Sequence, residues 1–193
     1  MRKALNKVPI INVTFRIANA YVYKGNPVHF KQVAPFELWK QRIGKGLFCS
    51  VILGCIMAFA LSYFHISDFK PESIILGIFP SILGFGIGVF ALLFALPTEF
   101  LDKLRESVKN STGESKIVGP EMLPADMAYP LLVYSLIMLI SVILGALPDG
   151  VISTAMATIM LLYGLIVTFE LLNSIFMTAS YMLISRRNND PQE

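Results

Sequence analysis

Long uncharged stretches of hydrophobic residues dominate the pattern of this sequence. Three of them, residues 47–64, 74–96 and 128–147, contain no charged side chain, and a fourth, residues 151–183, contains only Glu170. A helix needs about 20 apolar residues to cross the hydrocarbon core of a bilayer. The pattern therefore predicts an all-α membrane protein with four transmembrane helices.

The N-terminal segment, residues 1–46, has a different pattern. Val13, Phe15 and Ile17 alternate with Thr14, Arg16 and Ala18, and Lys24-Gly25-Asn26-Pro27 is typical of a turn. A period of two followed by a turn and a second β-favouring stretch predicts a β-hairpin. We therefore expect a hairpin packed against the membrane in front of the first helix.

The end of this segment carries an amphipathic pattern. Phe36, Trp39 and Ile43 recur at helical spacing, and basic side chains occupy other positions, namely Lys40, Arg42 and Lys45. One interpretation is an interfacial helix with Trp39 at the level of the lipid headgroups. The other is a first spanning helix that begins early and extends its basic side chains to the interface. The sequence leaves both open.

The connection between the second and third predicted helices is polar. Within this loop, residues 97–127, an apolar stripe predicts one short helix, formed by Phe100, Leu101, Leu104 and Val108. The proline-rich part that follows, up to the third span, is expected to be extended. After the fourth span only a short tail remains, residues 184–193.

Basic residues are distributed very unevenly. Of the 16 lysines and arginines, nine precede residue 47, four lie in the 97–127 loop and two follow the fourth span, so that Lys70 alone falls on the other side. The positive-inside rule assigns the basic side to the cytoplasm. Both termini are therefore expected in the cytoplasm, and the first apolar stretch begins too far into the chain for a cleaved signal peptide.

Glycines interrupt the second predicted helix. Gly77, Ser81, Gly84 and Gly88 fall at i, i+4, i+7 and i+11, and Gly86 lies off this stripe. The apolar flanks and the spacing exclude a phosphate-binding loop. Small residues at helical spacing allow membrane helices to approach closely. The stripe predicts a packing face, within the subunit or between copies, and its length slightly favours oligomerisation.

Glu170 is the only carboxylate in a predicted span. With about 1.5 Å of rise per residue, it lies on the cytoplasmic side of the midplane, near the expected depth of Arg42 and Lys45. We expect a structural ion pair or a hydrogen-bonded carboxylate there, with Asn173 and Ser174 as uncharged partners. Ion or proton conduction is the alternative for an ionisable residue inside a membrane.

Motifs for catalysis are missing from the sequence. The two histidines, His29 and His65, stand apart from paired carboxylates, and Cys49 and Cys55 lie on different faces of one predicted helix. We therefore expect a protein that is not an enzyme and holds neither a metal nor a cofactor.

The layout of four spans with both ends inside, together with the second-helix sequence "PSILGFGIGVF", resembles the small membrane subunits of bacterial anti-phage systems, in particular the KwaA family of the Kiwa system. The resemblance implies a homo-oligomer, a tetramer, that detects infection at the bacterial inner membrane. It also implies a cytoplasmic, DNA-binding partner like KwaB. No direct nucleic-acid binding is expected from the chain itself, because its basic residues are explained by topology and by anionic lipids.

The sequence thus favours a non-enzymatic sensor or scaffold that recruits a cytoplasmic protein. Its expected contact surfaces are the N-terminal segment, residues 98–126 and the end of the fourth helix. A small ion channel or transporter gated from the cytoplasm is the alternative, and it depends on Glu170.

Overall fold

Helices make up the regular structure of the part of the chain that the computed structural model describes, residues 9–64, 69–96, 98, 100–102, 105–106, 121–147 and 150–187, and no strand occurs among these residues. In chain order the elements are α2 (Pro9–Val22), the 3-10 helix η1 (Pro27–Phe30), α3 (Phe36–Trp39), the π-helical turn η2 (Lys40–Gly44), α4 (Lys45–Tyr63), α5 (Pro71–Leu92), the 3-10 helix η3 (Leu93–Ala95), α7 (Leu123–Gly145) and α8 (Val151–Arg187).

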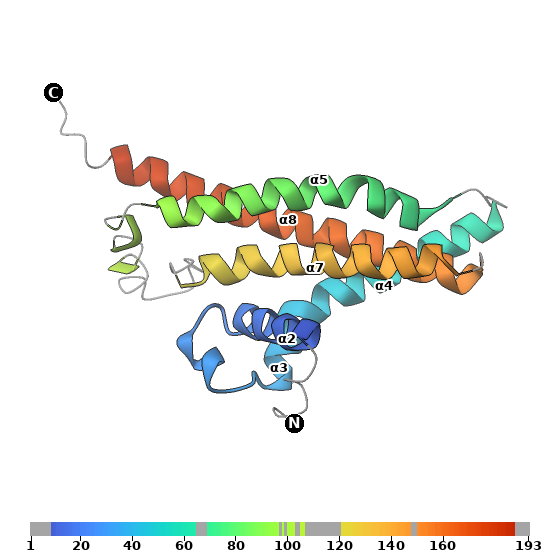
Figure 1. Ribbon diagram of the computed structural model, residues 1–193, viewed down its shortest axis with the longest axis horizontal. Helices are drawn as coiled ribbons and strands as arrows, with labels where there is room; N and C mark the ends of the chain where they lie inside the picture. The colour runs from blue at the N-terminus through green and yellow to red at the C-terminus, as the bar shows by residue number, and fades with distance from the viewer. Residues whose placement is uncertain are drawn as a thin grey trace.

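Four of the helices are long and apolar enough to cross a membrane, Phe36–Leu61, Pro71–Ala95, Leu123–Gly145 and Val151–Leu183. This confirms the prediction of an all-helical protein with four such segments. The helix α8 packs against α4, α5 and α7, while α5 also packs against α7 (Figure 1). The central position of α8 means that each of the other three long helices contacts it directly.

The first span is one continuous helix. α3, η2 and α4 follow one another without a break, so the helix begins at Phe36 and not at residue 47. Within this helix lies the π-helical turn η2, in which one extra residue is inserted into the helix. Trp39 is half-buried against the N-terminal segment: its indole N–H donates to the carbonyl of Ala34 at 3.2 Å, and its ring stacks on Phe15.

The prediction of an N-terminal β-hairpin is wrong. Residues Pro9–Val22 form α2, which packs on α7 beside the bundle (Figure 1). The buried residues of this segment, Ala18, Tyr21 and Val22, are spaced by three and four, which is the period of a helix. The alternation around Phe15 misled because it spans too few positions, and contact with α7 stabilises the helical period.

The turn after α2 is fixed by one buried amide. The Asn19 side chain donates to the carbonyls of His29 and Gln32, at 3.1 and 2.9 Å, and accepts the N–H of Ala34 at 2.9 Å. With three hydrogen bonds this buried polar group is well satisfied. Residues 9–35 therefore form a folded unit, which we call the N-terminal module.

The backbone of Gly25 lies against the chain just before α7. Its φ of +71° is in the left-handed region, and a Cβ atom there would lie 1.8 Å from the carbonyl oxygen of Glu121. Lys24 also has a positive φ, of 54°. Only glycine fits at position 25, because backbone from the start of the third span occupies the space of a side chain.

The third span begins earlier than its sequence indicated. α7 starts at Leu123, so that the proline-rich part of the 97–127 loop is helical from that residue on. Pro124 lies in the first turn of α7, where a missing N–H costs no hydrogen bond. The described residues at 98, 100–102 and 105–106 are helical, as predicted, and Phe100 packs with Leu123. Leu104 and Val108 lie outside the described residues.

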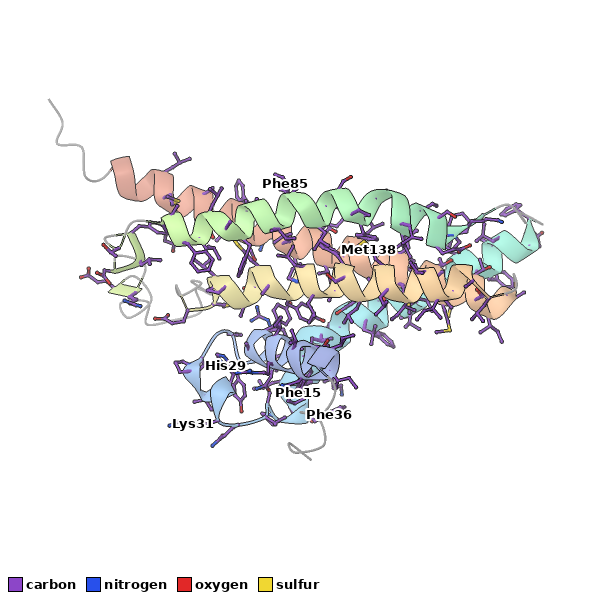
Figure 2. The ribbon with its side chains drawn as sticks, in the orientation of Figure 1. Phe15, His29, Lys31, Phe36, Phe85 and Met138 are labelled. Atoms are coloured by element: carbon purple, nitrogen blue, oxygen red, sulfur yellow. The ribbon has the colours of Figure 1, made fainter. Side chains whose placement is uncertain are left out.

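The second span has an outer face and an inner face. Figure 2 shows Phe85 on the outer side of α5 and Met138 between α5 and α7. Gly77, Gly84 and Gly88 have open space where a side chain would be, so at these three positions the predicted stripe packs against no helix of the described part of the chain. Gly86 does instead: a Cβ there would lie 2.4 Å from Leu131 Cδ2.

Candidate functional site

A buried ion pair lies at the end of the bundle where the N-terminal module packs. Arg42, from the π-helical turn, is paired with Asp126, from the first turns of α7. Their side chains are only 16% and 8% exposed. Removing a charge from water costs several kcal/mol unless a partner compensates it, so each of the two side chains requires the other.

Tyr21 of the N-terminal module lies beside this pair. The guanidinium carbon of Arg42 is 4.3 Å from the centre of the Tyr21 ring, and the ring of Tyr129 stacks on it at 4.0 Å, with 9° between the planes. Two groups at these distances cannot share one face, so Tyr21 is held between a cation and an aromatic ring. The first contact is a cation–π interaction.

The Tyr21 hydroxyl completes the arrangement by donating to Glu170 at 2.9 Å. Burial, and then the negative charge of Glu170, raise the pKa of Tyr21 above its usual value of 10.0. At neutral pH the phenol is therefore a protonated donor and Glu170 an acceptor. We call Arg42, Asp126, Tyr21, Tyr129 and Glu170 the interface cluster.

Hydroxyl groups continue from the interface cluster into the bundle. The hydroxyls of Tyr129 and Tyr163 are 2.6 Å apart, and Tyr134 donates to Thr168 at 2.9 Å. Thr168 in turn donates to the carbonyl of Gly164 at 2.8 Å. These bonds join α7 to α8 and satisfy polar groups that would otherwise be costly in an apolar interior.

A cavity of about 680 Å³ adjoins the interface cluster. Its charged lining comes from five side chains on four parts of the chain, Lys24, Arg42, Lys45, Asp126 and Glu170. Asn173 and Ser174 of α8 also line it, so most of the residues that the sequence grouped around Glu170 are brought together here. A cavity of this size with a few convergent polar groups is typical of a small-molecule site.

The predicted pairing inside this group needs correction. Glu170 accepts from Tyr21 and not from a cation, and Arg42 pairs with Asp126. Lys40 is exposed and is not among the residues that line the cavity. The carboxylate of α8 is thus hydrogen-bonded, one of the two expected outcomes, while the ion pair belongs to a different acid.

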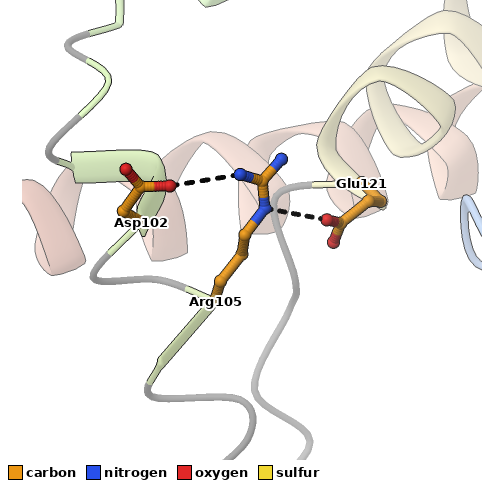
Figure 3. Close-up of polar contacts among 3 residues, drawn as sticks. All are labelled: Asp102, Arg105 and Glu121. Atoms are coloured by element: carbon orange, nitrogen blue, oxygen red, sulfur yellow. Dashed lines mark hydrogen bonds and ion pairs between the residues drawn. The ribbon is translucent and has the colours of Figure 1, made fainter.

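A second set of charges outside the spans offers a contrast. Figure 3 shows Arg105 between Asp102 and Glu121, at 3.1 Å from each. The hydrogen bond to Glu121 raises the pKa of Arg105. All three side chains are largely exposed, and exposed ion pairs contribute little to stability.

The sequence analysis did not identify three members of the interface cluster, namely Asp126, Tyr21 and Tyr129. Asp126 was assigned to the extended loop, and Tyr21 to the hairpin, so neither was placed beside Glu170. A carboxylate in the first turns of a spanning helix was the available signal for Asp126, because such a position places it opposite the basic residues that open the first span. For Tyr21 no local signal exists, since its role depends on the packing of α2 against α7.

In the described part of the chain, no group of three or more His, Cys, Asp or Glu side chains is placed to hold a metal ion. The interface cluster can position groups and bind charged ligands. Comparison with known protein families, curated proteins and solved structures finds no match to this chain.

Proposed function

We propose that this chain is a non-enzymatic membrane sensor or scaffold, in which the N-terminal module passes the arrangement of the spanning helices to a partner protein. The observation that carries the proposal is the position of Tyr21. Its three contacts, Arg42, Tyr129 and Glu170, belong to the first, third and fourth spans. A relative shift of any of these spans changes a contact that holds the N-terminal module.

The energies of these contacts suit a switch. A hydrogen bond to a charged acceptor contributes about 1.5–3 kcal/mol, and Glu170 is exposed to the cavity, which favours the lower end. Stacking contributes about 0.5–1.5 kcal/mol. A free-energy difference of 1.4 kcal/mol is a factor of ten in an equilibrium constant. The loss of the hydrogen bond to Glu170 or of the stacking on Tyr129 therefore changes the docking equilibrium of the N-terminal module by roughly tenfold.

The proposed cellular location and partner of this protein follow from its sequence. The positive-inside pattern favours the cytoplasm for the N-terminal module, and the resemblance to the KwaA family suggests an inner-membrane oligomer with a KwaB-like partner in anti-phage defence. The open stripe of Gly77, Gly84 and Gly88 leaves space for contact between copies, as membrane helices with small residues allow.

Conduction is the alternative that the cavity and Glu170 favour. Beyond the cavity, however, the Phe79 ring stacks on Tyr134 at 5.3 Å and lies against Gly164. These side chains fill the space between α5, α7 and α8. Ion flux into liposomes that contain the wild-type protein, lost in the Glu170→Gln variant, would favour the channel over the sensor.

Hydrogen exchange of the α2 amides in lipid nanodiscs tests the coupling. Tyr21→Phe removes the bond to Glu170, and we expect exchange in Pro9–Val22 to become roughly tenfold faster. Tyr23→Phe is the matched control in the same module, because its hydroxyl donates only to the carbonyl of Val33, at 3.3 Å. Exchange in this variant should match wild type.

Partner recruitment is tested by cross-linking in native membranes and quantitative mass spectrometry. A soluble protein recovered with wild type, and recovered in a different amount with Tyr21→Phe but not with Tyr23→Phe, supports the proposal. Recovery of no soluble protein, or unchanged recovery in every variant, contradicts the recruiting role.

A further inference from the structure

The cavity beside the interface cluster is lined by two further charged side chains, and one of them, Lys24, interacts electrostatically with Asp126. Arg42 and Asp126 compensate each other, but no described residue forms an ion pair with Lys24 or Lys45. Glu170 receives one hydrogen bond, from Tyr21 to its Oε2 atom. Two ammonium groups and one carboxylate with remaining acceptor capacity thus line the same space.

The backbone supports this arrangement on the side of the N-terminal module. Lys24 has a φ of 54°, a conformation that is unfavourable for residues other than glycine. The close contact of Gly25 with Glu121 fixes the turn. The fold therefore holds Lys24 at the cavity although its backbone conformation is unfavourable.

The position along the spans indicates where the ligand comes from. Lys45 is the tenth of the 26 residues of the first span and lies two residues before its uncharged stretch. Asp126 lies near the start of the third span, and Asn173 and Met177 lie in the final third of the fourth. The ends of spanning helices lie at the level of the lipid headgroups. Apolar side chains, including Leu123 and Met177, line the same cavity. Charged and apolar linings in one space fit an amphiphile.

We propose that this cavity binds the headgroup of a phosphoethanolamine lipid. Lys24 and Lys45 receive the phosphate as point charges, and Glu170 accepts hydrogen bonds from the primary ammonium. A choline headgroup has a cation without N–H donors, and a glycerol headgroup has no cation, so each lacks one half of the match. As the input of a sensor this ligand rests on the function proposed above, whereas as a binding site it is tested separately.

Native mass spectrometry of the full-length protein, released from detergent micelles, measures the binding. Phosphatidylethanolamine, phosphatidylcholine and phosphatidylglycerol with identical acyl chains are titrated, with inorganic phosphate and glycerophosphoethanolamine as chain-free arms. We expect phosphatidylethanolamine to bind about tenfold more tightly than the other two lipids. The chain-free compounds should bind far more weakly, because they bury no acyl chain.

Variants separate the two halves of the headgroup. Lys24→Gln and Lys45→Gln should weaken all three lipids by about tenfold each, while Lys40→Gln, an exposed lysine of the same span that does not line the cavity, should change nothing. Glu170→Gln should remove the preference for ethanolamine over glycerol. Because Glu170 also holds Tyr21, Asn173→Leu provides a second variant, which narrows the cavity without touching that bond and should weaken phosphatidylethanolamine.

Clear results overturn the site. The ethanolamine headgroup is contradicted by equal affinity for the three lipids, by lipid binding that survives both lysine substitutions, by an unchanged preference in Glu170→Gln, or by unchanged phosphatidylethanolamine binding in Asn173→Leu. Inorganic phosphate that binds as tightly as the lipid contradicts the membrane source. If lipid selectivity is present but no partner depends on Tyr21, the site stands and the recruiting function fails.

Discussion

The ion pair between Arg42 and Asp126 gives the most direct prediction for stability. Replacement of Arg42 by Gln leaves the Asp126 carboxylate, whose side chain is 8% exposed, without its cation. Removing one partner of a buried pair costs about 3–5 kcal/mol. The lost cation–π contact with Tyr21 adds about 0.5–2 kcal/mol. Together these terms amount to a large part of the stability of a typical domain.

A double substitution distinguishes the effect of the two charges from the effect of side-chain packing at the same site. Arg42→Met combined with Asp126→Leu removes both charges and keeps the volume roughly constant. Buried ion pairs replaced in this way by apolar residues are often close to neutral in stability. We therefore expect the double variant to be more stable than Arg42→Gln, with the remaining deficit set by the contact with Tyr21.

Unfolding by sodium dodecyl sulfate in mixed micelles measures these differences. Trp39, the single tryptophan of the chain, lies in the same span as Arg42 and stacks on Phe15, so its fluorescence reports the docking of α2 as well as unfolding. Helicity from circular dichroism follows the bundle. Arg105→Gln is the control, because Arg105 belongs to an exposed ion pair and its loss should leave the midpoint unchanged.

Either of two results would contradict an uncompensated buried charge as the cause of the lost stability. One is an Arg42→Gln midpoint equal to that of Arg105→Gln, which would mean that the buried carboxylate needs no partner. The other is a double variant as unstable as the single one, which would assign the loss to packing of the guanidinium and not to the uncompensated charge.

Further predictions concern the N-terminal module and the glycines. Because the folded-state pKa of Tyr21 is raised, its contribution is complete below about pH 10 and is lost as the pH rises above that value. The alkaline fall in stability should therefore be shallower in Tyr21→Phe, and equal slopes would contradict this. Gly86→Ala should destabilise the protomer by about 1–3 kcal/mol through overpacking on Leu131. Gly84→Ala should leave the stability of the protomer unchanged. Equal unfolding midpoints for these two variants would contradict the prediction. Gly25→Ala should detach the N-terminal module, seen as faster α2 hydrogen exchange, and full protection would refute the close contact at that residue.

Apolar stretch length was enough to predict the four long helices. Hydropathy reports the environment of a whole segment, so it finds Val151–Leu183 without any knowledge of its neighbours. It says less about where a helix begins. The first span starts at Phe36, and two of its basic side chains, Arg42 and Lys45, line the cavity, which exists only in the folded chain.

The candidate site was predictable only in part, for a related reason. An isolated carboxylate in an apolar segment is visible in the sequence, and Glu170 was singled out on that ground. Its partner Tyr21 is separated from it by 149 positions. Tyr21 belongs to a helix whose sequence contains a short alternating pattern, and that pattern predicted a strand. The stripe of Gly77, Gly84 and Gly88 shows the converse, since spacing identified a small-residue face but not which molecule covers it.

The length of α8 has a mechanical consequence. Its apolar span of 33 residues is about 50 Å long, whereas the hydrocarbon core of a bilayer is about 30 Å thick. A helix with this hydrophobic mismatch adapts by tilting or by extending beyond the bilayer. Glu170 is the 20th of the 33 residues of this span, whereas Tyr21 lies outside the spans, so we expect a change in the tilt of α8 to move the two residues relative to each other. Membrane thickness is thereby predicted to act on the contact that holds the N-terminal module.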